Sequence, residues 1–154
     1  MKALLAHSET LEILGLNDVR DPVQREGEKD TYEPMRSLED FKKVKDFTFD
    51  ILALVKGSID PEDKGAMRQT GQNLVTKMPP NVECLRIVFE NDYTRWAILV
   101  WAFIRSIRPH LPALRQIVVI LFDFSPVSHV IRGVLEMVGA TAGIKVEIHD
   151  MLAI

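Results

Sequence analysis

The 154-residue chain contains a single cysteine, Cys84. One cysteine excludes an internal disulfide and a thiolate-rich metal site, and low cysteine usage is typical of proteins in a reducing compartment. The N-terminal stretch from Met1 to His7 also lacks a signal-peptide core, because charged and polar residues interrupt its apolar run. We therefore expect an intracellular protein, either cytoplasmic or nuclear.

Long hydrophobic runs are missing as well. The longest uninterrupted apolar stretch runs from Trp96 to Ile104 and is closed by Arg95 and Arg105. A membrane span needs about 20 such residues. The stretch therefore predicts a buried helix, and we expect no membrane partner. Its aromatic residues, Trp96, Trp101 and Phe103, are either core or anchors for a partner.

The chain has no excess of positive charge. It contains 19 Lys and Arg against 22 Asp and Glu, which gives a net charge of −3. A nucleic-acid-binding domain normally carries a basic patch in a basic background. The densest basic cluster, Lys42, Lys43 and Lys45, is flanked closely by acidic residues, which indicates a solvated surface. We expect no nucleic-acid partner.

Motifs for catalysis or metal binding are scarce. Asp123, Ser125 and His129 supply the residue types of a hydrolase, but Ser125 precedes Pro126 as a helix N-cap and no Gly-x-Ser-x-Gly turn is present. The glycine-rich segment 139–143 lies between a helix and a strand, whereas a phosphate cradle precedes a helix. The four histidines lack the spacing of metal ligands. We therefore expect that the protein is not an enzyme and that it binds no cofactor and no metal ion.

One apolar pattern occurs five times: a large residue, two of any kind, a second large residue, one of any kind, and a third. The first residues of these units are 33, 38, 32 and 29 residues apart (11 to 44 to 82 to 114 to 143). This is the apolar skeleton of a leucine-rich repeat, in which a short strand feeds a helix. The five occurrences are Leu11, Leu14, Leu16; Val44, Phe47, Phe49; Val82, Leu85, Ile87; Leu114, Ile117, Val119; and, weakly, Gly143, Val146, Ile148.

The chain is predicted to form one domain over residues 1–154, with its best-formed repeats at 82–150 and loops at 17–34 and 56–63. Strands are expected at 11–16, 46–52, 82–90, 115–122 and 144–149, and a short helix begins at Ser37. Longer helices are expected from Asp60–Asp63 to Lys77, over 93–107, and from Pro126 to Val138. Gly65 and Gly71 suggest flexibility in the first of these. Alternating strands and helices predict parallel strands joined by right-handed crossovers.

Two architectures share this order. A doubly wound sheet is apolar on both strand faces, whereas a repeat stack leaves one strand face to solvent. In each of the five units, one position lies between the second and third large residues and one lies two residues further on, directly after the third. Of these ten positions, only Val88, Val118 and Ile120 are apolar. This favours an α/β fold of parallel strand-helix repeats, an irregular leucine-rich-repeat-like solenoid fragment. Either something covers Val118 and Ile120, or they form the apolar centre of a binding surface.

Several segments resemble the degenerate leucine-rich-repeat region of F-box proteins from filamentous fungi. They are Ser37–Asp50, Met78–Ile87, Leu111–Ile117 and Gly143–Val146, within residues 36–150. The resemblance implies repeats that select a target protein for ubiquitin transfer. The family's F-box, which docks the ligase adaptor, precedes the repeats, whereas Met1 begins inside one. The resemblance therefore implies a truncated relic without adaptor binding, and uncapped repeat ends predict self-association.

The sequence thus predicts a non-catalytic protein-recognition module. The alternative is a small doubly wound nucleotide-binding or enzyme domain, with a crevice near Asp92, Asp123 and Asp150; a third possibility is a gene fragment without independent function. For the recognition module, the predicted contacts on the strand face are Thr48, Asp50, Arg86, Val88, Val118, Ile120, Glu147 and His149.

Overall fold

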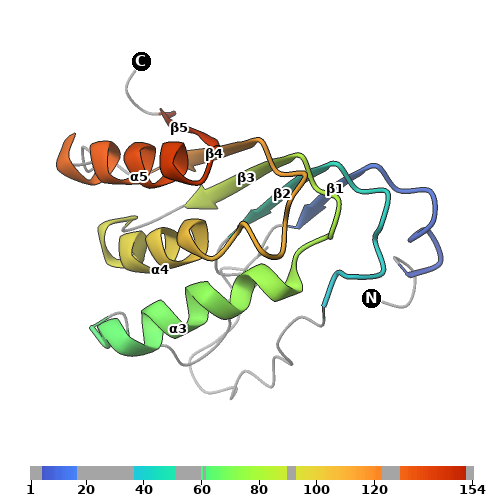
Figure 1. Cartoon of the computed structure of the whole chain (residues 1–154), viewed down its shortest axis with the longest axis horizontal. Coiled ribbons are helices and arrows are strands. Elements are labelled where there is room, and N and C mark those ends of the chain that lie inside the picture. Colours follow the sequence, from blue (N-terminus) through green and yellow to red (C-terminus); the bar gives the residue numbers. More distant parts are fainter. Residues whose placement is uncertain are drawn as a thin grey trace, which may run out of the picture.

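The computed structural model describes residues 5–16, 37–50, 60, 62–89, 93–122 and 129–151. In this part of the chain the fold is α/β, with five strands and three helices (Figure 1). The predicted loop at 17–34 and most of the one at 56–63 lie outside it. The strands are β1 (Ile13–Leu16), β2 (Asp46–Asp50), β3 (Cys84–Phe89), β4 (Gln116–Leu121) and β5 (Lys145–Asp150); the helices are α3 (Lys64–Leu74), α4 (Tyr93–Arg105) and α5 (His129–Thr141).

The five strands form one parallel sheet whose order, β1-β2-β3-β4-β5, is the order of the chain. Each strand is hydrogen-bonded to the next one along the sequence. A doubly wound sheet reverses its strand order at a switch point. The described strands run from β1 to β5 without such a reversal, so the parallel α/β prediction is confirmed and the doubly wound order is wrong.

The register of the sheet follows the apolar pattern of the sequence. The second residues of the five units align in one row across the strands, and the third residues align in the next. Both rows are buried except for Leu16, which is half-buried at the edge. The rings of Phe47 and Phe49 stack within β2 at 5.1 Å. The rows are Leu14, Phe47, Leu85, Ile117, Val146 and Leu16, Phe49, Ile87, Val119, Ile148.

The helices cover this apolar side of the sheet. Figure 1 shows α3, α4 and α5 side by side along one face of the strands. Burial alternates accordingly: in β3, Leu85 and Ile87 are fully buried whereas Arg86 and Val88 between and after them are half-buried. Parallel sheets are usually covered on both faces. The described helices cover only one, as the alternation of polar residues in the strands predicted.

Gly71 lets α3 approach α4 closely, which corrects the prediction of flexibility. A Cβ atom at Gly71 would lie 2.3 Å from the backbone oxygen of Leu99 and 3.0 Å from the Cβ of Ala102. Glycine is therefore required here by packing. Phe103, on the same helix α4, lies in the core, whereas Trp96 and Trp101 are half-buried.

Helix α5 ends later than predicted. It continues to Thr141 instead of ending before Gly139. Gly139 is buried inside the helix, where a Cβ would lie 2.3 Å from the Cγ2 of Val146. The chain turns at Gly143, whose φ of 70° is costly for other residues. The glycine that ends the helix is therefore Gly143, and Gly139 allows close packing on β5.

The segment after Ser37 forms successive tight turns instead of the predicted short helix. The N–H of Phe41 donates to the carbonyl of Leu38 at 3.0 Å, and the N–H of Val44 to that of Phe41 at 3.3 Å. Ser37 Oγ accepts from the N–H of Glu39 at 3.2 Å. These bonds span two or three residues, not the four of an α-helix. The turns direct Leu38, Phe41 and Val44 into the core.

One hydrogen-bond arrangement recurs at the starts of β2, β3 and β4. The acceptor is the backbone carbonyl of the residue directly before one strand. It accepts the N–H groups of two consecutive residues at the start of the next strand. Glu12 accepts from Lys45 and Asp46 at 2.9 and 3.2 Å, and the following acceptors are Lys45 and Glu83. These three acceptors and Arg115, which accepts from Lys145 at 2.9 Å, are spaced by 33, 38 and 32 residues (12 to 45 to 83 to 115). Backbone bonding therefore repeats at the intervals of the apolar pattern.

Among the described strands β5 is the last in the sheet, and its outer edge carries a side-chain cap. In a parallel pair, alternate residues of a strand bond to each side. Lys145 and Met151 donate to β4, which turns the carbonyl of Ile148 to the free edge. Arg132 of α5 donates to that carbonyl from Nη1 at 3.2 Å. The guanidinium thus occupies part of an edge that was expected to be open; self-association stays a prediction.

Candidate recognition surface

The eight residues predicted as contacts lie together on the sheet face opposite the helices, which we call the open face. They form two rows across β2 to β5, because equivalent residues of parallel strands are in register. The first row is Thr48, Arg86, Val118 and Glu147; the second row is Asp50, Val88, Ile120 and His149.

A third row of the open face was missed. It lies two residues before the first row and contains Asp46, Cys84, Gln116 and Lys145. The signal was available in the sequence, because residues two apart in a strand share a face. The prediction counted only positions between and after the apolar marks and therefore began one row too late.

Burial differs within the open face. Asp50 and Val118 are only 3% and 6% exposed, so they offer a partner little surface. Val118 lies between Arg86 and Glu147 in its row, and the longer side chains of these neighbours flank it. Ile120 stays half-buried. Two alternatives were open for Val118 and Ile120 of β4: they are covered, or they form the apolar centre of a binding surface. Val118 is covered, whereas Ile120 remains accessible.

An ion pair joins β2 and β3 on the open face. Arg86 Nη1 donates to Asp46 Oδ1 across the two strands, from the first row to the third. The hydrogen bond to Asp46 raises the pKa of Arg86 above its ordinary value. Both side chains are about one-third exposed, so the pair adds little to stability but fixes the direction of the guanidinium.

A second charged cluster lies on β5. Lys145, Glu147 and His149 alternate along the strand and therefore share the open face. Lys145 Nζ pairs with Glu147 Oε1, and His149 Nε2 lies 3.2 Å from Glu147 Oε2. The hydrogen bond from Lys145, followed by that from His149, holds the pKa of Glu147 below its ordinary value. The carboxylate thus stays ionised between two donors.

The reactive side chains of the open face are not arranged for nucleophilic catalysis. Burial raises the pKa of the Cys84 thiol, although Arg86 partly opposes this. The thiolate is the nucleophilic form, so burial reduces reactivity. His149 lies on β5, two strands from Cys84 on β3. His149 aligns with Val88, four residues beyond Cys84 along β3. With strands about 4.8 Å apart and a rise of about 3.3 Å per residue, the two residues lie roughly 16 Å apart, which is beyond hydrogen-bond reach.

The remaining candidate catalytic residues lie partly outside the described ranges. Asp92, Asp123 and Ser125 lie outside the described residues, and His129 is exposed at the start of α5. Asp150 is half-buried at the end of β5. Within the described ranges, no group of three His, Cys, Asp or Glu side chains could hold a metal ion. No helix in these ranges is long and apolar enough to cross a membrane.

The chain matches no family model, no curated protein and no solved structure. The resemblance to the repeats of fungal F-box proteins therefore stays a prediction from the motifs.

Proposed function

We propose that this chain is a non-catalytic protein-recognition module with a leucine-rich-repeat-like solenoid fold, which contacts its partner through the open face. One observation carries the proposal. In the described part of the chain, the helices cover one side of a parallel sheet, and the predicted contact residues form two adjacent rows on the other side.

The repeated backbone bonding supports the solenoid part of the proposal. A repeat protein buries the apolar face of each unit only against its neighbours, so each unit contacts the next in the same way. Here the strands follow the order of the chain, and the shared carbonyl acceptors recur at the spacing of the apolar pattern.

The composition of the open face supports recognition. Val88 and Ile120 form a half-buried apolar centre on β3 and β4. The Asp46–Arg86 pair lies on one side of this centre, and the cluster around Glu147 lies on the other. An apolar centre with a polar rim is the usual anatomy of a protein interface. The side chains come from strands and not from loops, which holds them in fixed positions.

The motif resemblance indicates the kind of partner. On that basis we propose that the module resembles the substrate-binding repeats of fungal F-box proteins. We also propose that its partner is a protein selected for ubiquitin transfer. The rim of the open face is half-exposed and carries both positive and negative side chains. It therefore favours a partner surface that is polar without net charge, or one that carries charges of both signs.

A peptide-display selection against the immobilised chain would provide a defined binder for the test. The double substitution Arg86→Ala and Ile120→Lys removes one rim charge and charges the apolar centre. Loss of an interface hot spot of about 2 kcal/mol weakens binding roughly 30-fold, and we expect at least this loss. The matched control is Met137→Lys, an exposed apolar residue on α5. Circular dichroism should show the same fold in all variants.

Two results would refute the proposal. The first is that none of the selected binders loses affinity through the double substitution. The second comes from a thermal-shift screen with nucleotides and divalent metals: a clear, saturable rise in melting temperature would favour the nucleotide-binding or enzyme alternative.

A further inference from the structure

Helix α5 carries an uncharged stripe on its outer side. Val130, Gly133, Val134 and Met137 recur at helical spacing, and Val130 and Met137 are 73% and 63% exposed. The same helix buries Leu135 towards the sheet. A surface helix normally presents charged and polar residues on the side opposite the core. Core packing therefore does not account for this stripe.

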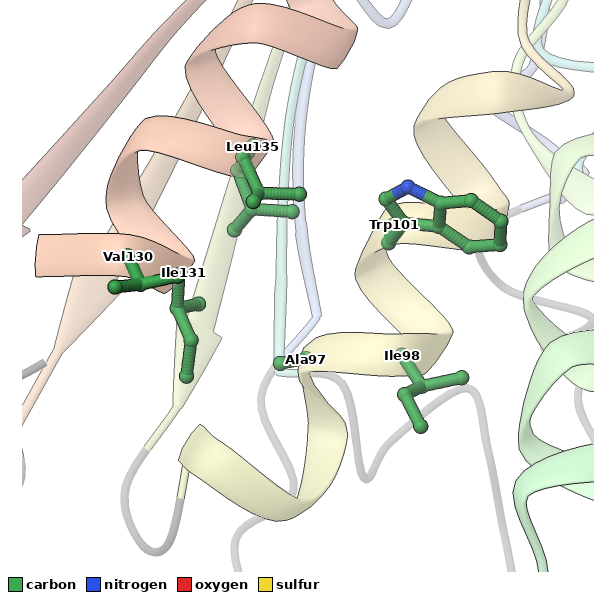
Figure 2. Close-up of a pocket in the computed structure, with 7 residues that line it drawn as sticks. Ala97, Ile98, Trp101, Val130, Ile131 and Leu135 are labelled. Atoms are coloured by element: carbon green, nitrogen blue, oxygen red, sulfur yellow. The ribbon is translucent and has the colours of Figure 1, made fainter. Parts of the chain in front are cut away.

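The stripe borders a hollow between α5 and α4. The hollow has a volume of about 190 Å³. In Figure 2, Ile131 and Leu135 of α5 lie across from Ala97 of α4, and the indole of Trp101 lies further across α4 on the side of α3. Sites for drug-sized ligands span roughly 300–1,000 Å³. This smaller hollow suits one large apolar side chain. It is lined by Val130, Ile131, Val134 and Leu135 of α5 and by Ala97, Ile98 and Trp101 of α4.

Two arginines lie at the Trp101 end of this apolar surface. The Cζ of Arg105 is 4.9 Å from the centre of the Trp101 ring, and that of Arg68, from α3, is 5.7 Å away. Such cation–π contacts fix the guanidinium groups but leave their charge uncompensated. Within the described residues, neither arginine forms an ion pair with a carboxylate. Their positive charge therefore complements an acidic occupant.

We propose that the groove between α4 and α5 is a second interaction site, which docks an amphipathic helix of a partner protein. The helix inserts one large apolar side chain between α4 and α5, and its carboxylates face Arg68 and Arg105. Helices bind apolar grooves through side chains at positions i, i+4 and i+7. This site lies on the helix side of the molecule and is separate from the open face.

Two other occupants fit the charges less well. A second copy of the chain would bring the same uncharged stripe and the same two arginines, and like charges in an interface are unfavourable. An anionic membrane would attract the arginines, but the chain as a whole has a net charge of −3. A membrane-binding surface also usually carries several Lys and Arg residues beside a protruding apolar face. Both occupants remain outcomes of the test.

The probe is a pair of stapled helical peptides without tryptophan. Both carry leucines at i, i+4 and i+7; one has glutamates beside this stripe and the other has lysines. The chain's two tryptophans, Trp96 and Trp101, both lie on α4, so their fluorescence reports binding at the groove. We expect the glutamate peptide to bind at least 10-fold more tightly than the lysine peptide. Added salt should reduce this preference.

Three substitutions locate the site. Val134→Lys places a charge in the hollow and should abolish binding of the glutamate peptide. Arg105→Glu should reduce or invert the preference between the two peptides. The matched control is Ile13→Lys, which changes an apolar residue that is 71% exposed on β1 and should leave binding unchanged. Ile120→Lys, on the open face, should also leave it unchanged, which separates this site from the proposed function.

The proposal is overturned if neither peptide binds at high micromolar concentration, or if both bind equally. It is also overturned if Val134→Lys binds as well as the original chain. Sedimentation with vesicles containing phosphatidylserine would assign the surface to a membrane if Val134→Lys abolished it. A concentration-dependent dimer that Val134→Lys dissociates would assign it to a second copy.

Discussion

Replacing Gly71 by alanine measures how tightly α3 packs against α4. The added Cβ would lie 2.3 Å from the backbone oxygen of Leu99, whereas ordinary contacts begin at 3.4 Å. The two helices must therefore separate by about 1.1 Å (3.4 minus 2.3). A flexible side chain could rotate away from the new methyl group, but the backbone of α4 cannot. The separation would loosen the core between these helices, which includes Met67 and Leu99.

Gly133→Ala is the matched control for this change. Gly133 lies in the middle of α5, and a Cβ there would meet nothing within 4 Å. Alanine favours a helix over glycine by about 1 kcal/mol, and this gain applies at both positions. Overpacking a core costs roughly 1–3 kcal/mol. The difference between the two variants isolates the packing effect, so Gly71→Ala should be about 1–3 kcal/mol less stable than Gly133→Ala.

Urea unfolding followed by circular dichroism gives both free energies of unfolding. Thermal unfolding provides a second measurement, since 1 kcal/mol shifts the melting temperature of a chain of this size by roughly 2–4 °C. We expect Gly133→Ala to melt above the original chain and Gly71→Ala to melt below Gly133→Ala. Equal stabilisation by both substitutions would refute the close approach of α3 to α4.

Three further predictions concern the sheet. In a carboxyl NMR titration, Glu147 should have a pKa below its ordinary value of 4.5, and Lys145→Ala should raise it. Because the folded pKa is lowered, the contribution of Glu147 to stability is present above 4.5 and is lost as the pH falls through the folded pKa. Cys84, whose pKa burial raises, should react with iodoacetamide at higher pH in the folded chain than in urea. Arg132→Ala should release the edge carbonyl of Ile148 and increase self-association in sedimentation velocity.

Each of these predictions has an opposing result. A pKa of Glu147 that does not change in Lys145→Ala would contradict the pairing on β5. Identical pH profiles for Cys84 in the folded and unfolded chain would mean that its burial does not affect the thiol. Arg132→Ala that stays monomeric at high concentration would show that the guanidinium does not protect the edge. Arg115→Ala, which removes an exposed arginine at another position, is the control for the last test.

The open face illustrates what strand periodicity predicts well. Residues two apart share a face, so the apolar marks in β3 and β4 placed Arg86 and Ile120 on the opposite side without any tertiary information. The spacing between units equals the spacing of the residues that the structure aligns across the sheet. The same rule applies to the third row. The prediction missed this row because it considered only positions after the second apolar residue of each unit, and not the position before it.

The glycines show where such reasoning fails. Local propensity predicts flexibility at Gly71 and a helix end at Gly139. Their actual role depends on Leu99 and Val146, which lie in other elements. Local sequence does not reveal how near another backbone will come. The same holds for Ser37, where core contacts of the apolar residues after it favour tight turns over a short helix.

The sequence by itself determined the parallel α/β class, the rows of apolar residues and the side of each strand on which a residue lies, because these depend on periodicity along one chain. Only the tertiary structure decided that Val118 is buried while Ile120 is accessible, that Arg132 caps the edge of β5, and that α4 and α5 leave an apolar hollow. These features depend on distances between elements, and those distances are set by the packing of all of them together.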